Sequence, residues 1–187
     1  MVGRLLAQMG VGSITLYDPD IIEDVNLAPQ GWPTREIGSQ KTAVLKKEMV
    51  ELNPTLRIET FECYFPPHHL ERYDARFCCV DTIEARNVLW QNMPKTGLLV
   101  DGRSAGECLE VYGVDCSSET AREAYGKTLF PQDEAYQGTC TTVSLNYTAA
   151  IAAGLEVSQY TRWIREIPLQ HIKNNILSGE QESTIVP

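Results

Sequence analysis

The chain has 187 residues, of which 43% are hydrophobic and 22% charged, and this composition suits one globular domain with a substantial core. Its formal net charge of −9 argues against nucleic acid as the main partner, because phosphate contacts need a basic surface. No apolar run approaches the length that spans a membrane and no signal peptide is visible, so we expect a cytoplasmic protein without a membrane partner.

The first half of the chain predicts helices that alternate with strands. Apolar residues at helical spacing mark the helices, and short apolar or alternating runs mark the strands. A long polar loop with three prolines interrupts them, and a loop of this length in a compact domain is usually functional. In chain order, the predictions are a helix over 1–10, a strand over 14–17, a loop over 19–37, a helix over 38–52, and strands over 56–61 and 77–80.

The second half continues the alternation. Asp81 closes the preceding strand, and Thr82 is placed to cap a helix in which Val88 and Leu89 face the core. The further predictions are a buried strand over 98–100 closed by Asp101, a strand over 108–114 at an antiparallel edge, a short helix over 119–125, a long helix over 141–166, and a tail over 168–187 that either forms a hairpin or drapes over the core.

Strands that alternate with helices indicate an α/β fold. We expect a Rossmann-like, doubly wound and mostly parallel sheet with helices on both faces. The chain is predicted to be one domain over 1–187, with a core over 1–114, a crossover and helical region over 115–166, and a C-terminal tail over 167–187.

Acidic residues follow three of the predicted strands, namely Asp18, Asp81 and Asp101. Ligands of such sheets bind outside the carboxyl ends of the strands. The rim that these three acids share is therefore the candidate site.

The cysteines and histidines do not predict a metal centre. None of the six cysteines forms a C-x-x-C pair, so no zinc is expected, and reduced buried thiols are the simplest interpretation. Cys78 and Cys79 are adjacent in an apolar strand and should point to opposite faces. We interpret His68 and His69 as residues of a Pro-rich loop rather than as metal ligands.

A series of short motifs then follows in order. The chain reads Gly10-Val11-Gly12, Asp18-Pro19-Asp20, Asn26-Leu27, Gln30, Gly38, Lys41, Asn53-Pro54, and Asp81 followed by Arg86. In this order and at near-family spacing, the motifs resemble the adenylylating superfamily of ThiF, MoeB and HesA proteins and the ubiquitin-activating enzymes. The resemblance covers residues 1–103 well, and beyond them Gly138-Thr139-Cys140-Thr141 before a long helix has the family's general shape.

The resemblance implies a nucleotide-binding homodimer that uses ATP and magnesium to adenylylate the C-terminal carboxylate of a small ubiquitin-like or sulfur-carrier protein. Such a step needs positioning and charge stabilisation rather than covalent help. By resemblance, Asp18 holds the ribose hydroxyls, Lys41 neutralises the phosphates, Asp81 holds the magnesium ion, Asn26 and Gln30 line the pocket, and Gly3 ends the glycine loop.

A cysteine that accepts the activated carboxylate as a thioester is also implied. Cys140 is the first candidate, because it precedes a helix whose dipole favours the thiolate, and Cys116 is the second. The alternative interpretation of Cys140 is a small buried thiol at a helix start.

Plain structural interpretations stand beside the other assignments. Asp18 and Asp81 can simply cap loops at strand ends, and Lys41 can be a solvated residue in the first turn of a helix. Arg86, in the same way, can pair with Glu84 or another neighbour on its own helix.

Two departures from the family pattern matter. Met1-Val2-Gly3 matches only the end of the glycine loop, so the first strand is missing and its neighbours are left with unpaired backbone, which predicts poor stability for the isolated chain. Pro29 stands where the family has an arginine, a charge that Arg35 or Arg103 could supply.

These departures keep two alternative functions open. One is a catalytically impaired family member that acts as a partner-binding or scaffold subunit. The other is a Rossmann protein that binds a nicotinamide or flavin cofactor through Asp18, although it leaves Asn26-Leu27 and Lys41 unexplained.

Overall fold

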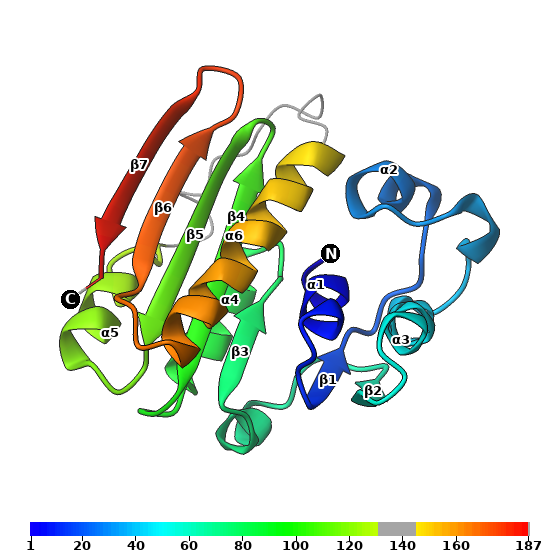
Figure 1. The fold of residues 1–187 in the computed structure, drawn as a ribbon, viewed down its shortest axis with the longest axis horizontal. Helices are drawn as coiled ribbons and strands as arrows, with labels where there is room; N and C mark the ends of the chain where they lie inside the picture. Colours follow the sequence, from blue (N-terminus) through cyan, green and yellow to red (C-terminus); the bar gives the residue numbers. More distant parts are fainter. Residues whose placement is uncertain (131–144, 187) are drawn as a thin grey trace.

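A computed structural model of the chain describes residues 1–130 and 145–186. Its strands form two sheets, which Figure 1 shows at the two sides of the molecule. Within the described residues, no strand lies between β1 and β3. Each of these two strands therefore pairs with a described strand on one side only. The α/β class is confirmed.

The two sheets differ in how their strands pair. β1 (Ser13–Tyr17) and β2 (Arg57–Phe61) pair in parallel. The second sheet has the order β3-β4-β5-β6-β7, in which the first pair is parallel and the other pairs are antiparallel. Its strands are β3 (Ala75–Cys78), β4 (Leu98–Ala105), β5 (Cys108–Asp115), β6 (Gln170–Asn175) and β7 (Glu180–Ile185).

Helices cover both faces of the five-stranded sheet (Figure 1). Alternate residues of β4 separate two cores: Leu98 and Val100 pack with residues of α6, whereas Leu99 packs with residues of α5. A third core joins α1, α3 and the small sheet around Met49. The helices are α1 (Val2–Gln8), α2 (Leu27–Gln30), α3 (Lys41–Leu52), α4 (Ile83–Gln91), α5 (Glu119–Gly126) and α6 (Asn146–Ile164).

Local sequence explains several helix ends. The side chain of Thr82 accepts a hydrogen bond from the backbone N–H of Ala85, so the predicted cap of α4 is confirmed. Gly38 adopts a positive φ of 85° in the turn before α3, which is why that helix begins at Lys41 and not at the predicted Gly38. The predicted C-terminal hairpin is formed by β6 and β7.

Other predicted boundaries were wrong. The loop over 19–37 contains α2 and two short 3-10 helices, η1 (Asp24–Asn26) and η2 (Thr34–Glu36), and another, η3 (Pro67–Arg72), precedes β3. The first residue of β3 comes two positions before the predicted start. β5 is antiparallel as predicted but lies inside the sheet, because β6 continues it. Residues 141–144 of the predicted long helix lie outside the described residues.

β4 is longer than predicted. Its pairing with β5 continues past Asp101 to Ala105, so Asp101 lies within the strand and does not end it.

No helix among residues 1–130 and 145–186 is long and apolar enough to cross a membrane.

Candidate functional site

The carboxyl ends of β1 and β3 carry two of the three predicted acids. Asp18 directly follows β1 and is half-buried, and Asp81 is exposed between β3 and the N-cap of α4. Burial raises the pKa of the Asp18 carboxyl, the charges of Asp20 and Asp81 add to that rise, and the charge of Lys41 opposes it. Asp20, Lys41 and Asp81 are therefore all within electrostatic reach of Asp18, and we call these four residues the rim cluster.

Lys41 is tied to the segment that follows β1. Its Nζ atom lies 2.9 Å from Oδ2 of Asp20, and its backbone N–H donates to the Asp20 carbonyl at 3.1 Å. The Lys41 side chain is only 12% exposed, whereas that of Asp20 is 61% exposed. Oδ1 of Asp18 accepts a hydrogen bond from the backbone N–H of Asp20 at 2.9 Å. Lys41 is thus held against the loop and does not extend into solvent.

The other residues predicted to bind the nucleotide have local partners. Oδ1 of Asn26 accepts from the N–H of Glu23 at 3.1 Å, and Oε1 of Gln30 accepts from Nε1 of Trp32 at 2.9 Å. Gly3 lies in α1, where an added Cβ would be 3.1 Å from Sδ of Met49. The structure therefore gives Gly3 a packing role between α1 and α3.

The predicted cysteines divide differently. Cys140 lies outside the described residues. Cys116 is fully buried, and burial raises the pKa of its thiol to about 11, so it is a poor nucleophile near neutral pH. Cys78, the last residue of β3, is buried, and Cys79, which was predicted to share the strand, follows it and is exposed.

Asp101 is not a rim residue, which corrects the sequence interpretation. Its side chain is fully buried within β4. Oδ1 accepts from Nε of Arg86 at 2.9 Å, and Oδ2 accepts from Nε of Arg103 at 2.7 Å and from the hydroxyl of Tyr125 at 3.0 Å. Both oxygens are therefore saturated by the protein itself.

The same contacts account for the arginines. Arg86 forms an ion pair with Asp101, so the expected pairing on its own helix is not the main one. Arg103 is committed to Asp101 and to Thr128, while Arg35 is 77% exposed beside Glu36. Because Arg103 is bound to these partners, it does not replace the positive charge of the family's arginine, where this chain has Pro29.

Glu156 is a buried acid that the sequence interpretation missed. It lies on the sheet-facing side of α6, against Gly102 of β4, and Oε2 is 3.9 Å from Sγ of Cys79. Burial, followed by the charge of Asp101, raises the pKa of the Glu156 carboxyl to about 8. The available signal was its helical spacing from the apolar Ala152 and Ala153.

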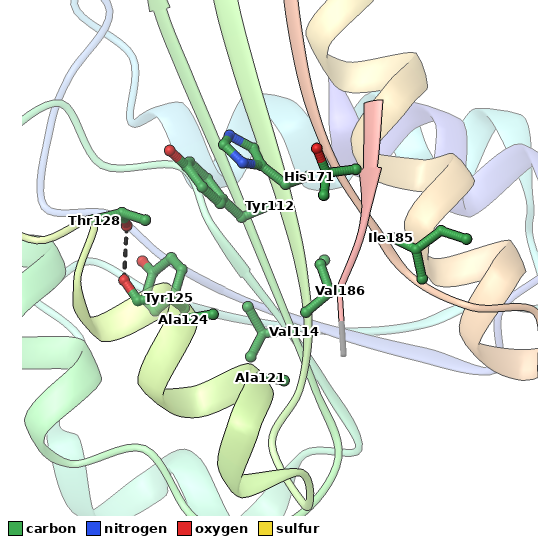
Figure 2. A pocket seen from close by; sticks show the side chains of 11 residues that line it. Tyr112, Val114, Ala121, Ala124, Tyr125, Thr128, His171, Ile185 and Val186 are labelled. Carbon is green, nitrogen blue, oxygen red and sulfur yellow. Dashed lines mark hydrogen bonds between the residues drawn. The ribbon is translucent and has the colours of Figure 1, made fainter. Parts of the chain in front are cut away.

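Two cavities lie away from the rim cluster. One is an open hollow of about 430 Å³ lined by Pro67, His68, Glu71 and Asn92. Figure 2 shows the other, of about 150 Å³, which α5, β5, β6 and β7 enclose. No predicted site residue lines either of them. The second cavity is lined by Tyr112, Gly113, Val114, Ala121, Ala124, Tyr125, Thr128, His171, Thr184, Ile185 and Val186.

Known proteins resemble this chain in sequence. The sequence model of the ThiF family matches residues 1–185. A probable molybdopterin-synthase adenylyltransferase of Porphyra purpurea is 39% identical to this chain over 57 residues. The matched segment is 30% of this chain and 15% of that protein.

Solved structures show the same fold. PaaA superposes with a TM-score of 0.76 at 15% identity, and Escherichia coli MccB in complex with ATP superposes with a TM-score of 0.75 at 17% identity. Each match covers 99% of this chain and 59% of the other, so the chain spans about three fifths of the length of these structures.

Proposed function

The chain belongs to the ThiF family, and from this premise we propose that it adenylylates the C-terminal carboxylate of a small ubiquitin-like or sulfur-carrier protein. The observation that supports the proposal is the rim cluster, in which Asp18, at the carboxyl end of β1, is within electrostatic reach of Lys41 and of Asp81, which follows β3. This is the edge at which parallel sheets bind nucleotides. Family membership also favours this function over nicotinamide or flavin binding.

The proposed reaction transfers the adenylyl group of ATP. An oxygen of the ionised carboxylate forms a bond to the α-phosphorus, the bond from that phosphorus to the bridging oxygen breaks, and pyrophosphate leaves. No proton has to move, so the protein contributes positioning and charge stabilisation. In this scheme Asp18 binds the ribose hydroxyls, and Lys41, released from Asp20, neutralises phosphate charge.

A magnesium ion fits the chemistry of the rim cluster. Among the described residues, no group of three or more His, Cys, Asp or Glu side chains could form a complete metal cage. Mg²⁺ does not need one, because it is usually bound by one or two carboxylates together with phosphates and water. A cation would offset the negative charge of these acids, and exposed Asp81 is the proposed ligand. The ion would draw electron density from the phosphates.

Named relatives support the substrate class. MccB has been solved with ATP, and also with AMPCPP and MccA, and the curated relative is named as an adenylyltransferase for molybdopterin synthase. A homodimer and a role for Asn26, Gln30 or Cys140 remain proposals that rest on the family resemblance.

The proposal is tested by exchange of labelled pyrophosphate into ATP with a candidate carrier protein. We expect Lys41→Ala and Asp81→Ala each to lower the exchange rate about 100-fold or more, roughly the loss of one charge-stabilising group. Lys47→Ala is the matched control on α3, because Lys47 is exposed on the same helix. Asp74→Ala is the matched control for Asp81, because Asp74 is exposed at the other end of β3. Equal rates in all four variants and in the unmodified protein would end the catalytic interpretation.

A scaffold function is the second candidate, and a specific observation favours it. Pro29 replaces the family's arginine, and Arg86 and Arg103 are held by Asp101. A subunit that only binds a partner would capture the carrier protein equally well with and without ATP. The scaffold function would be supported if the unmodified protein shows no pyrophosphate exchange and Lys41→Ala still binds the carrier protein in a pull-down assay.

A further inference from the structure

Arg86 lies between the N-cap of α4 and β4 of the five-stranded sheet. Its guanidinium is buried, with only 4% of the residue exposed. Nε donates to Asp101 at 2.9 Å, one terminal nitrogen donates to the carbonyl of Thr82 at 3.1 Å, and the other donates to the carbonyl of Gly102 at 3.1 Å. Each nitrogen therefore has a protein acceptor, and the guanidinium is not free to bind a phosphate.

The contact with Thr82 matters because of what precedes it. Thr82 is the N-cap of α4, and Asp81 is its neighbour in the chain. The guanidinium fork thus links the carbonyl of Thr82, the residue after Asp81, to the carbonyl of Gly102 in β4 by donating to both. A buried cation thus ties the residue next to an exposed carboxylate to the sheet.

Asp101 in turn fixes the orientation of Arg86. Its second oxygen is occupied by Arg103 and by the hydroxyl of Tyr125, which lies on α5. Arg103 also donates to the carbonyl and the hydroxyl of Thr128 just beyond that helix. A buried ion pair is weak support for stability, since apolar replacements are often neutral or better. These buried ion pairs of Asp101 are better explained by a need to hold Arg86 in one orientation.

We propose that Arg86 is a positioning residue that holds Asp81 in the orientation needed to bind the divalent ion of a nucleotide complex, and that Asp101 orients Arg86. This inference rests on the proposed function of the rim cluster. Neighbours that orient a metal ligand are known to change metal affinity by about 10-fold to 100-fold when they are removed. Arg86→Lys keeps the charge and loses the fork that bonds the two carbonyls.

The test is the binding of Mn²⁺ in the presence of AMPCPP, followed by the loss of the free-ion electron paramagnetic resonance signal. We expect Arg86→Lys to weaken Mn²⁺ binding about 10-fold or more. Tyr125→Phe is the matched control, because it removes a hydrogen bond from the same Asp101 carboxylate and leaves the contact with Thr82 intact. We expect its Mn²⁺ affinity to stay within about twofold of the unmodified protein.

The possible outcomes separate the two proposals. If the unmodified protein binds no Mn²⁺ with AMPCPP, the proposed function fails and this inference fails with it. If it binds Mn²⁺ and folded Arg86→Lys binds equally well, only the positioning role is overturned. Equal weakening in Arg86→Lys and Tyr125→Phe would also overturn it, because that result marks general loosening. Should Arg86→Lys not fold, Asp101→Asn replaces it with the same expected loss and the same overturning result.

Discussion

The ionised form of the buried Glu156 side chain destabilises the folded protein. The carboxyl lies between α6 and β4, with Cys79 as its described hydrogen-bond partner. Burial, followed by the charge of Asp101, disfavours the ionised carboxylate, and together they outweigh the charge of Arg86, which favours it. The ionised form is therefore less stable in the folded protein than in the unfolded chain.

This predicts a pH dependence of stability. Because the folded pKa of about 8 lies above the usual value of 4.5, the folded state holds the proton more tightly than the unfolded chain. The protonated carboxyl therefore stabilises the folded state fully below the pKa of the unfolded chain. This stabilisation is lost as the pH rises through the pKa of the folded state, by about 1.4 kcal/mol for each pH unit between the two pKa values. We expect Glu156→Gln to flatten the free energy of unfolding between about pH 5 and pH 8.

Urea unfolding across that range measures the effect. The exposed Glu51→Gln variant, which removes an acid from α3, serves as the control. A Glu156→Gln profile as steep as that of the control would show that the buried carboxyl does not titrate as described.

Sequence reasoning at this scale identified residues whose partners are local. Lys41 and Asp18 were predicted from their places after a strand and at a helix start, and the structure brings both into the rim cluster. Asp101 was misplaced because an acid after three apolar residues looks like a strand end. Its partners Arg86 and Tyr125 are 15 and 24 positions away, and no local pattern reports such pairings.

At the level of elements, α6 packs unusually close to β4 and β5. Gly102 faces Glu156 so closely that a Cβ would overlap its carboxyl, and a Cβ on Gly113 would lie 2.6 Å from Oε1 of Gln159. That oxygen accepts a hydrogen bond from the backbone N–H of Gln170 at 2.9 Å. The glycines therefore set the distance between the helix and the sheet, and Gln159 ties the helix to β6.

A pair of glycine substitutions tests this contact. We expect Gly113→Ala to lower the free energy of unfolding by about 1–3 kcal/mol, because Gln159 must move from a close-packed position. Gly154→Ala on α6 has nothing within 4 Å of its added Cβ. We expect it to raise that free energy by about 1 kcal/mol through helix propensity. Thermal and urea unfolding of both variants measure the difference, and equal effects would contradict the close approach.

Element type was predicted better than element length. The alternation of helix and strand is confirmed along the first half of the chain, where apolar periodicity is regular. β4 extends past its apolar core because β5 pairs with it through Ala105, and pairing with a distant strand leaves no mark in the residues themselves. The same reason explains why β5, predicted at an edge, is an inner strand.

For the whole molecule, the question is how two sheets without shared backbone bonds act together. α6 contacts α1 and α2, which belong to the side of the small sheet, while it packs on β4 and β5. We propose on this basis that the chain is one domain, joined through helix packing across the interruption.

One domain predicts one unfolding transition. Trp32 reports on the small-sheet side, where Arg4 lies 4.9 Å from the centre of its ring, and Trp163 reports on α6. We expect variants that retain only one of these tryptophans to unfold at the same urea concentration by fluorescence and by circular dichroism. Earlier unfolding around Trp32 alone would indicate two separately stable units.

The central claim, that the rim cluster binds a magnesium nucleotide, is tested most directly by calorimetric titration of the purified protein with magnesium AMPCPP. We predict saturable binding to the unmodified protein and binding weakened about 10-fold or more in Lys41→Ala, with Lys47→Ala unchanged. Undetectable binding to the unmodified protein, or equal affinity in Lys41→Ala, would contradict the account.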